Sequence, residues 1–334
     1  MTVNLPLNPR EMWFAVADNV NEDPRLRMDK SSESSPKSRR AELSTAMVDA
    51  ARDVETTLGE VLPRPHGLHG RVHEAMRYAT FAGGKRLRPF LVLHSARLFG
   101  VPEARARRVA AALEAMHTYS LVHDDLPCMD DDDLRRGRPT THKAFDEATA
   151  GLAGDALLTI AFEILSDPAT HESGEVRCRL IARLAEASGS NGMIGGQMID
   201  MQAPTRTFNP DDVIHLQRLK TGALFEYACE AGAILAEVGM AAQERLRHYA
   251  RDLGLAFQIA DDLLDVTGTT EQLGKTAGKD VEQGKATLVS VYGVDGARAE
   301  ANKLAASAAA HLEEFGEKAS LLRELPYFMV DRES

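Results

Sequence analysis

Aspartate residues crowd one short stretch of the chain. The segment YSLVHDDLPCMDDDDLRRGRPTTH, residues 119–142, carries six aspartates between Asp124 and Asp133, and Arg135 and Arg136 follow almost directly. Neighbouring carboxylates repel one another unless a cation lies among them, so the run is either a solvated loop or a metal site. Clustered carboxylate oxygens suit Mg²⁺, which is readily shared with substrate phosphates. This segment alone leaves both interpretations open.

The spacing within this stretch requires a turn. Asp130 lies six residues after Asp124, which is off the same face of a regular helix. Pro127 is expected to end the helix and let the chain loop, so that Asp130 returns toward Asp124. An EF-hand is a poor alternative, because the loop glycine and the terminal Glu are missing and Thr141 occupies the twelfth position from Asp130.

A second acidic group lies in FQIADDLLDV, residues 257–266. Asp261 and Asp265 are four residues apart, so on a helix both carboxylates project from one face, and Gln258 joins that face. Asp262 lies between them. A lone DDxxD usually belongs to an ordinary exposed helix surface. Here the flanking residues are apolar, so the acids interrupt a core-like segment and require compensating cations.

Basic residues are available for that compensation. The segment GGKRLRP, residues 83–89, offers Lys85, Arg86 and Arg88 in a turn that opens with glycine and leads into a helix. Such a turn can hold an anion by side chains and by the helix N-terminus together. His117 lies two turns before Asp124 on nearly the same face and suits a donor facing a phosphate. More bases follow in separate segments, namely Arg135, Arg136, Lys220, Lys275 and Lys285. Two aspartate groups with several separated cations predict a cavity for two polyanions and bridging metals.

Helices must position these residues. In the first of them Leu43, Met47, Ala51, Val54 and Leu58 recur at steps of three and four, which makes one apolar stripe. Similar patterns predict helices over 42–62, 69–81, 103–126, 143–165, 175–187, 210–238 and 241–266. No stretch reads as a βαβ series, and SGSNGMIGG is typical of a turn between helices. The expected architecture is therefore all-α, a large single-domain helical bundle.

Composition supports this architecture and excludes some functions. The 334 residues are 44% hydrophobic with only 5% aromatics, which suits a large Ala- and Leu-rich helical core. Residues 1–40 contain the polar run DKSSESSPKSRR and are predicted to form a flexible extension, with the folded domain over 41–334. The net charge of −11 and the pI near 5.5 argue against a nucleic-acid binder.

The compartment is predicted to be the cytoplasm. The three cysteines Cys128, Cys178 and Cys229 are far apart and form no CxxC pair, so no disulfide framework is indicated. No window approaches the ~20 consecutive apolar residues of a membrane span. The first 40 residues mix acids and bases, which fits neither a secretory signal nor a transit peptide.

Six motifs together make the sequence similar to one family. In order they are GGKRLRP, HTYSLVHDDLPCMDDDDLRRGRPTTH, GMIGGQMIDM, LKTGALFEYA, FQIADDLLDVTG and LGKTAGKDVEQGKAT, over about residues 83–287. They resemble those of trans-isoprenyl diphosphate synthases, most closely the bacterial farnesyl diphosphate synthases (geranyltranstransferases). The resemblance implies a bundle around a deep cavity, a homodimer, and Mg²⁺, about three ions per active site, shared with diphosphate. The implied substrates are isopentenyl diphosphate and an allylic diphosphate, with neither nucleic acid nor membrane as a partner.

The resemblance also implies roles, residue by residue. The metal ligands would be Asp124, Asp130, Asp261 and Asp265. Further members of the catalytic group would be Asp125, Asp262, Lys220, Thr221 and Gln258. The allylic diphosphate would be held by Arg135, Lys220 and Lys275, and isopentenyl diphosphate by Lys85, Arg88, His117 and Arg136. Lys285 would lie in the phosphate region, and Gln197 and Asp200 would serve packing or support.

Product length is expected to depend on the helix that carries Asp124. Helix geometry aligns Ser120 with Asp124 more directly and puts Tyr119 to one side. A bulky aromatic five positions before the first aspartate nevertheless resembles the bacterial farnesyl diphosphate synthases. The alternatives are a geranylgeranyl diphosphate synthase and, less favoured, a non-catalytic partner subunit or a class I terpene cyclase.

Overall fold

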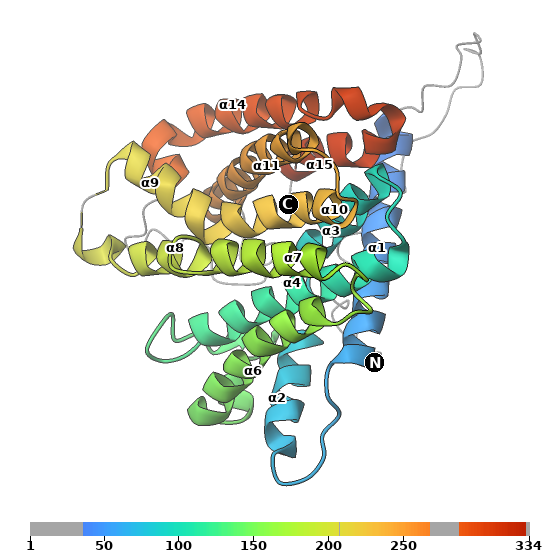
Figure 1. Ribbon diagram of the computed structural model, residues 1–334. Coiled ribbons are helices and arrows are strands. Elements are labelled where there is room, and N and C mark those ends of the chain that lie inside the picture. The colour runs from blue at the N-terminus through green and yellow to red at the C-terminus, as the bar shows by residue number, and fades with distance from the viewer. Residues whose placement is uncertain (1–35, 207, 268–286, 332–334) are drawn as a thin grey trace, which may run out of the picture.

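Helices build almost the whole molecule. The structure is a computed structural model that describes residues 36–206, 208–267 and 287–331 (Figure 1). The α-helices are α1 (Pro36–Val61), α2 (Gly70–Thr80), α3 (Leu87–Leu98), α4 (Glu103–Asp124), α5 (Thr141–Ala144), α6 (Glu147–Ser166), α7 (Gly174–Ser188), α8 (Met193–Asp200), α9 (Pro210–Gln217), α10 (Ala223–Leu235), α11 (Met240–Thr267), α14 (Leu288–Ala310) and α15 (Ser320–Val330). In the described ranges the only sheet is a hairpin of β1 (Leu134–Arg135) and β2 (Arg138–Pro139), which run antiparallel. The prediction of an all-α bundle is confirmed.

The core lies among α3, α4, α6 and α10, whose apolar residues are packed at very low exposure. Aromatic and long aliphatic side chains such as Phe90, Leu113 and Phe225 are fully buried, each at 0% exposure. Small residues let the helix backbones approach closely. A Cβ at Gly232 of α10 would lie 2.3 Å from the backbone nitrogen of Ala96 in α3, so only glycine fits at this crossing.

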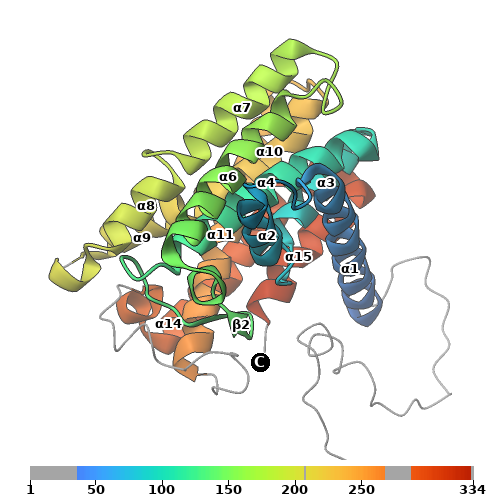
Figure 2. The same ribbon diagram turned by 90° about the horizontal axis from the view of Figure 1, so that it is seen from below.

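The outer helices surround this core. Along the upper edge in Figure 1, α14 packs over α11, which carries the second acidic group. Seen from below in Figure 2, α2 lies between α6 and α1, as it also does in Figure 1. The helices with the two acidic groups are therefore both packed against outer helices.

Two of the predicted helices are not regular α-helices throughout. The helix predicted over 143–165 is divided into α5 and α6 because Asp146 caps α6, its carboxylate accepting the Thr149 N–H at 2.7 Å. The helix predicted over 210–238 is continuous but contains the π-helical turn η2 (Arg218–Gly222) between α9 and α10. Such turns concentrate at functional sites, and this one contains Lys220 and Thr221.

The turn predicted at SGSNGMIGG is only partly correct. A turn over Ser190, Asn191 and Gly192 is followed by α8, which begins at Met193 and continues through Gly195 and Gly196. Those glycines are needed for packing: a Cβ at Gly196 would lie 2.3 Å from the backbone nitrogen of Lys220. Glycine in this segment therefore allows close contact between α8 and η2. The sequence alone had predicted only a turn.

The N-terminal boundary differs slightly from the prediction. The helix α1 begins at Pro36, before the predicted domain start at residue 41. Arg40 is joined to Asp331 near the other end of the described chain by an ion pair of 2.8 Å, and Leu43 is fully buried. The prediction of a flexible extension falls mainly on residues 1–35, which lie outside the described residues.

One helix, α6, is long and apolar enough to cross a membrane, with a mean hydropathy of 1.5 over an 18-residue window. Half of that window is buried inside the protein. The apolar residues Ala153, Leu157, Ala161 and Leu165 face the core at 0% exposure. Packing within the bundle accounts for the composition of this helix, and core helices commonly satisfy the same length and composition test.

Candidate active site

The first acidic group folds back on itself. The helix α4 ends at Asp124, and the N–H of Asp130 donates to the carbonyl oxygen of Asp124 at 2.9 Å. The next N–H, of Asp131, donates to the Leu126 carbonyl at 3.2 Å, and Asp131 itself takes a left-handed φ of 47°. The predicted turn at Pro127 is confirmed, and it brings Asp130 back beside the end of the helix.

Charge crowding at Asp124 suits a cation. Burial raises the pKa of Asp124 from 3.8 to about 6, and the like charges of Asp130 and Asp125 act in the same direction. Lys220 and Arg135 oppose the shift but do not cancel it. A divalent cation among these oxygens would relieve the repulsion, so the donor set fits the hard oxygen-ligated metal that the sequence predicted.

Asp125 holds an arginine in place beside this group. Its carboxylate is 3% exposed and accepts a hydrogen bond from Arg135 Nε at 2.7 Å. Burial raises the pKa of Asp125, and the bond to Arg135 opposes that rise. Arg135 also acts electrostatically on Asp124. The arginine is therefore fixed next to the first acidic group by a residue that cannot itself turn toward solvent.

The remaining acids of the run are bonded within the loop. Asp133 forms an ion pair of 2.9 Å with Lys143, and the exposed fraction of its side chain is 78%. Asp132 lies 3.4 Å from Arg135. These contacts order the β1–β2 hairpin and fit the role of loop charge.

The bases that open α3 point in different directions. Arg86 is buried at 3% exposure, in a left-handed conformation with φ 47°, and bonds Glu114 and the carbonyl of Thr80. Arg88 instead places its guanidinium 5.1 Å from the ring centre of Phe225 and 3.3 Å from His117 Nε2. Arg86 therefore stabilises the turn internally, whereas Arg88 faces the other predicted site residues.

Negative charges on two different helices act on Arg88. Burial lowers the pKa of Arg88 to about 10, while the negative charges of Glu114 and Asp261 raise it and Arg136 lowers it. Asp261 belongs to the second acidic group on α11, whereas Glu114 is on α4. One guanidinium thus lies within electrostatic reach of helices that are far apart in the sequence.

His117 is held neutral. Burial lowers its pKa well below the ordinary value, and the charges of Arg88, Arg136, Arg86 and Arg135 lower it further. A neutral ring can accept at Nε2 from Arg88. The predicted phosphate-facing residue is therefore uncharged here, and it orients Arg88 by accepting its hydrogen bond.

Gly84 makes room for Arg136. Its guanidinium donates to the carbonyl oxygen of Gly83. Gly84 has φ +122°, and a Cβ there would lie 2.4 Å from Arg136 Cζ. Any side chain at Gly84 would therefore displace Arg136, which gives the GG pair a steric reason as well as a conformational one.

Within the second acidic group, Asp262 differs from its neighbours. Both of its oxygens accept protein hydrogen bonds, one from Gln258 Nε2 at 2.8 Å and one from the Leu288 N–H at 2.8 Å. Asp261 is half-buried and Asp265 is buried at 3% exposure. Asp262 thus fixes Gln258 and ties the start of α14 to α11.

The π-helical turn lies between the two acidic groups. Thr221 Oγ1 donates to Gln258 Oε1 at 3.3 Å, which links η2 to α11. Among the positive charges, Lys220 has the largest effect on the pKa of Asp124. Its Nζ lies 2.5 Å from Asp200 Oδ2. This ion pair fits the supporting role expected of Asp200, although the sequence did not identify Lys220 as its partner. Asp200, near the end of GMIGGQMIDM, was the available signal for this ion pair. Nothing in the sequence showed that α8 would lie against η2.

Tyr119 and Ser120 have different environments. Tyr119 is 6% exposed, and its ring stacks edge-to-face on His123 at 5.4 Å. Burial and the charges of Asp124 and Asp155 raise its pKa to about 12. The Ser120 hydroxyl donates to the His117 carbonyl at 2.9 Å and is satisfied by its own helix. Tyr119 is therefore the larger buried obstacle near Asp124.

Some predicted residues cannot be placed. Lys275 and Lys285, with most of LGKTAGKDVEQGKAT, lie outside the described residues. Lys85 is exposed at the turn before α3. The other predicted residues are brought together by the end of α4, the start of α3, η2 and the end of α11.

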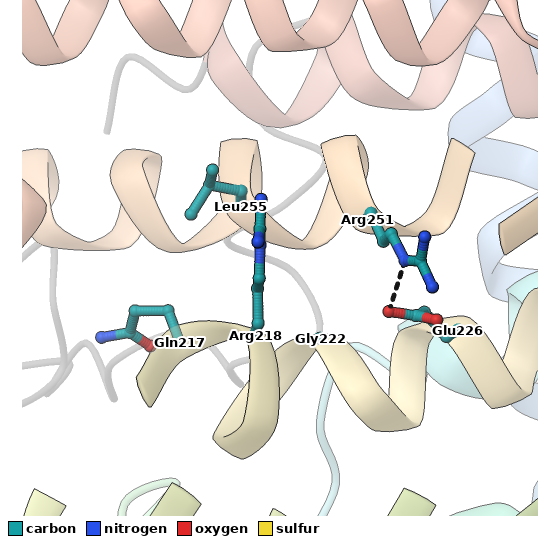
Figure 3. A pocket seen from close by; sticks show the side chains of 6 residues that line it. All are labelled: Gln217, Arg218, Gly222, Glu226, Arg251 and Leu255. Carbon is teal, nitrogen blue, oxygen red and sulfur yellow. Dashed lines mark hydrogen bonds and ion pairs between the residues drawn. The ribbon is translucent and has the colours of Figure 1, made fainter. Parts of the chain in front are cut away.

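A separate small recess lies between η2, α10 and α11 (Figure 3). It is lined by Gln217, Arg218, Gly222, Glu226, Arg251 and Leu255. The ion pair of Arg251 Nε with Glu226 Oε1, at 3.0 Å, closes one side. None of the predicted site residues lines this recess, so it is distinct from the acidic site.

The chain is similar to known proteins over most of its length. The family model "Polyprenyl synthetase" matches residues 69–325. "Farnesyl diphosphate synthase" of Geobacillus stearothermophilus is 44% identical over 246 residues, 73% of this chain and 82% of the relative. "Geranylgeranyl pyrophosphate synthase 11, chloroplastic" of Arabidopsis thaliana is 44% identical over 86% of this chain and 81% of its own. A solved structure of an FPP/GFPP synthase from Zymomonas mobilis has a TM-score of 0.79 and 48% identity, covering 87% of this chain and 99% of that one.

Proposed function

Because the chain belongs to the polyprenyl synthetase family, as its match over residues 69–325 shows, we propose that it condenses isopentenyl diphosphate head to tail with an allylic diphosphate to give farnesyl diphosphate. The chain is a prenyltransferase of the trans-prenyl diphosphate synthase type. The proposal also includes the dependence on Mg²⁺, the choice of allylic primer and the length of the product.

One observation carries the proposal. The turn η2 reaches both acidic groups, since Lys220 acts on Asp124 and Thr221 bonds Gln258 one turn before Asp262. Fixed cations and uncharged oxygens thus lie between two sets of carboxylates. A reaction that expels pyrophosphate needs this combination, because negative charge grows on the leaving oxygens while positive charge grows on carbon.

The residues that would hold the metal are Asp124, Asp130, Asp261 and Asp265. Bound Mg²⁺ would supply charge neutralisation for the leaving diphosphate. Asp125 keeps Arg135 beside these ligands, and Asp262 keeps Gln258 oriented, so we assign Asp125 and Asp262 to positioning.

The cationic residues divide into two diphosphate sites. Arg135 and Lys220, with Lys275, would hold the allylic diphosphate. Arg88 and Arg136, with Lys85 and the neutral His117, would hold isopentenyl diphosphate, and Lys285 would reach the phosphate region. Half-buried arginines suit this task, because each offers a fixed fork of donors to phosphate oxygens.

The proposed chemistry needs no nucleophile from the protein. Cleavage of the allylic C–O bond releases pyrophosphate and leaves an allylic cation, which the double bond of isopentenyl diphosphate attacks. The oxygens of Thr221 and Gln258 would face this cation. Loss of a proton to the departed pyrophosphate then restores the double bond.

Tyr119 is the residue that favours the farnesyl product. It is buried on α4 about one turn before Asp124, where the growing tail would pass. Geranylgeranyl diphosphate is the alternative, because relatives of equal identity have either name. The homodimer and the cytoplasmic location stay predictions.

The experiment is an assay of pyrophosphate release with Mg²⁺ and dimethylallyl or geranyl diphosphate, with and without isopentenyl diphosphate. The proposal predicts release only when isopentenyl diphosphate is present, together with farnesyl diphosphate as the main product. Release from the allylic substrate alone would indicate a cyclase. No release with either primer would indicate a non-catalytic subunit.

A further inference from the structure

Three histidines lie together outside the acidic site. His66 and His69 are in the connection between α1 and α2, and His73 is in the first turns of α2. Their ring centres are 4.9–5.2 Å apart in all three pairings. Figure 1 shows this connection at the lower edge of the molecule, away from α9 and α14. The reaction proposed above uses none of these residues.

The backbone holds two of the rings in a metal-binding tautomer. The carbonyl oxygen of Arg64 lies 2.8 Å from His66 Nδ1 and 3.2 Å from His73 Nδ1. A carbonyl can only accept, so both Nδ1 atoms carry the hydrogen and both Nε2 atoms keep a lone pair. Histidines that bind metals typically donate their second ring nitrogen to a backbone carbonyl in this way.

The spacing of the rings suits a small cation. One ring nitrogen from each histidine lies within 4.8 Å of the others. Nitrogens bound to one tetrahedral Zn²⁺ are separated by about 3.4 Å, so the rings need to close by about 1–1.5 Å. His66 and His69 are exposed, so their rings have room for this movement, while His73 is anchored at 9% exposure.

We propose that His66, His69 and His73 bind a late first-row divalent cation such as Zn²⁺, Co²⁺ or Ni²⁺. Three imidazole nitrogens select these ions over Mg²⁺, which prefers oxygen. Exposure of two of the rings leaves a fourth position for water. A bound ion connects the loop to the first turns of α2 and stabilises the folded state by mass action. This site is independent of the proposed reaction.

The test uses Co²⁺ and Zn²⁺ on the full chain in excess Mg²⁺, which occupies the carboxylate sites. We expect one Co²⁺ per chain with a tetrahedral visible absorption spectrum, and a melting temperature that rises with added Zn²⁺. His66→Ala and His69→Ala each weaken binding by roughly 100-fold or more, since even loss of a partner to a ligand costs ~10–100-fold. Both residues are exposed, so the metal-free melting temperature should stay unchanged.

The matched control is His248→Ala, which removes another exposed histidine with a histidine neighbour, His311, at 5.4 Å. It should leave the Co²⁺ stoichiometry and spectrum intact. Binding that survives in both His66→Ala and His69→Ala, or that disappears in His248→Ala, would overturn the proposal. Turnover with Mg²⁺ is not used as a readout, so failure here would leave the proposed reaction untouched.

Discussion

The backbone N–H of Asp130 donates to the carbonyl oxygen of Asp124 at 2.9 Å. Asp124 and Asp130 are six residues apart in the sequence, and this bond brings their backbones side by side. The bond can form because the last carbonyls of a helix have no partner within the helix. The motif therefore uses a helix end to bring its second aspartate back beside the first. On the proposed function, these like charges gather where Mg²⁺ would bind.

Loss of the charge at Asp200 should disturb Lys220. Asp200→Asn removes the partner of the Lys220 ammonium, so the cation is no longer held beside Asp124. We expect kcat to fall about 10-fold to 100-fold, because small misplacements of a catalytic group are costly. KM for the allylic diphosphate should change much less, since the positive charge remains. Steady-state kinetics separate the two, and Asp200→Glu should restore part of kcat; an unaltered kcat in Asp200→Asn would refute the positioning role.

Truncation at Tyr119 should lengthen the product. Tyr119→Ala removes a ring that is only 6% exposed on the helix of Asp124 and opens space for a longer tail. The expected shift is from farnesyl to geranylgeranyl and longer diphosphates, measured by chromatography with labelled isopentenyl diphosphate. The free energy of unfolding should also fall by about 3–5 kcal/mol. Tyr119→Phe keeps the ring and should keep the product; identical products from all three proteins would rule out this role.

Gly84 and Gly83 offer a matched pair of substitutions. Both have positive φ, +122° and +90°, so Ala strains the backbone at each. Only at Gly84 does the added Cβ meet Arg136, at 2.4 Å from Cζ, whereas nothing lies within 4 Å at Gly83. Gly84→Ala should therefore raise KM for isopentenyl diphosphate about 10-fold, the loss of roughly one charge-assisted contact. Gly83→Ala should lower only the melting temperature; equal KM values in the two variants would contradict the assignment of Arg136.

Acid should destabilise the bundle through His94. Burial, together with the positive charge of Arg97, lowers the pKa of His94 to about 3. Arg97 also donates to His94 Nε2 at 2.9 Å. The unfolded chain binds the proton near the ordinary value of 6.5, so the folded state is favoured above 6.5 and loses stability as the pH falls toward 3. Between pH 6.5 and 5 the loss from this group is about 2 kcal/mol.

The check is urea unfolding of the wild type and His94→Gln at both pH values. Gln keeps an acceptor for Arg97 but does not titrate, so the variant should lose about 2 kcal/mol less on acidification. His248→Gln, at an exposed position, should behave as the wild type does. The same loss in His94→Gln as in the wild type would show that another group is responsible.

Much of the fold was accessible from the sequence, because apolar residues at steps of three and four leave little choice of element. The helix α1, which contains Leu43, Val54 and Leu58, was predicted from that pattern alone. The break at Asp146 was missed, since its capping bond is decided by one carboxylate inside an otherwise helical pattern. The helix α8 was missed because its glycines serve contact with η2, which only tertiary packing creates.

The sequence predicted which residue types make up the site, but not which partner each side chain contacts. Spacing indicated that Asp124 and Asp130 would meet, because proline cannot continue the helix between them. Nothing in the spacing showed that Arg86 would turn inward to Glu114 while Arg88 faced His117. The spacing also could not show that both oxygens of Asp262 accept hydrogen bonds, one from Gln258 and one from the start of α14. These choices depend on which neighbour each side chain meets in the folded chain.

The central claim is that two separate aspartate groups act together on one diphosphate. Its most direct test is kcat for pyrophosphate release from geranyl and isopentenyl diphosphates at saturating Mg²⁺, in Asp124→Asn and Asp261→Asn. The control is Asp133→Asn, at a loop acid paired with Lys143. The account predicts a loss of at least about 100-fold in each of the first two variants and near-normal kcat in the control. Wild-type kcat in either Asp124→Asn or Asp261→Asn would contradict it.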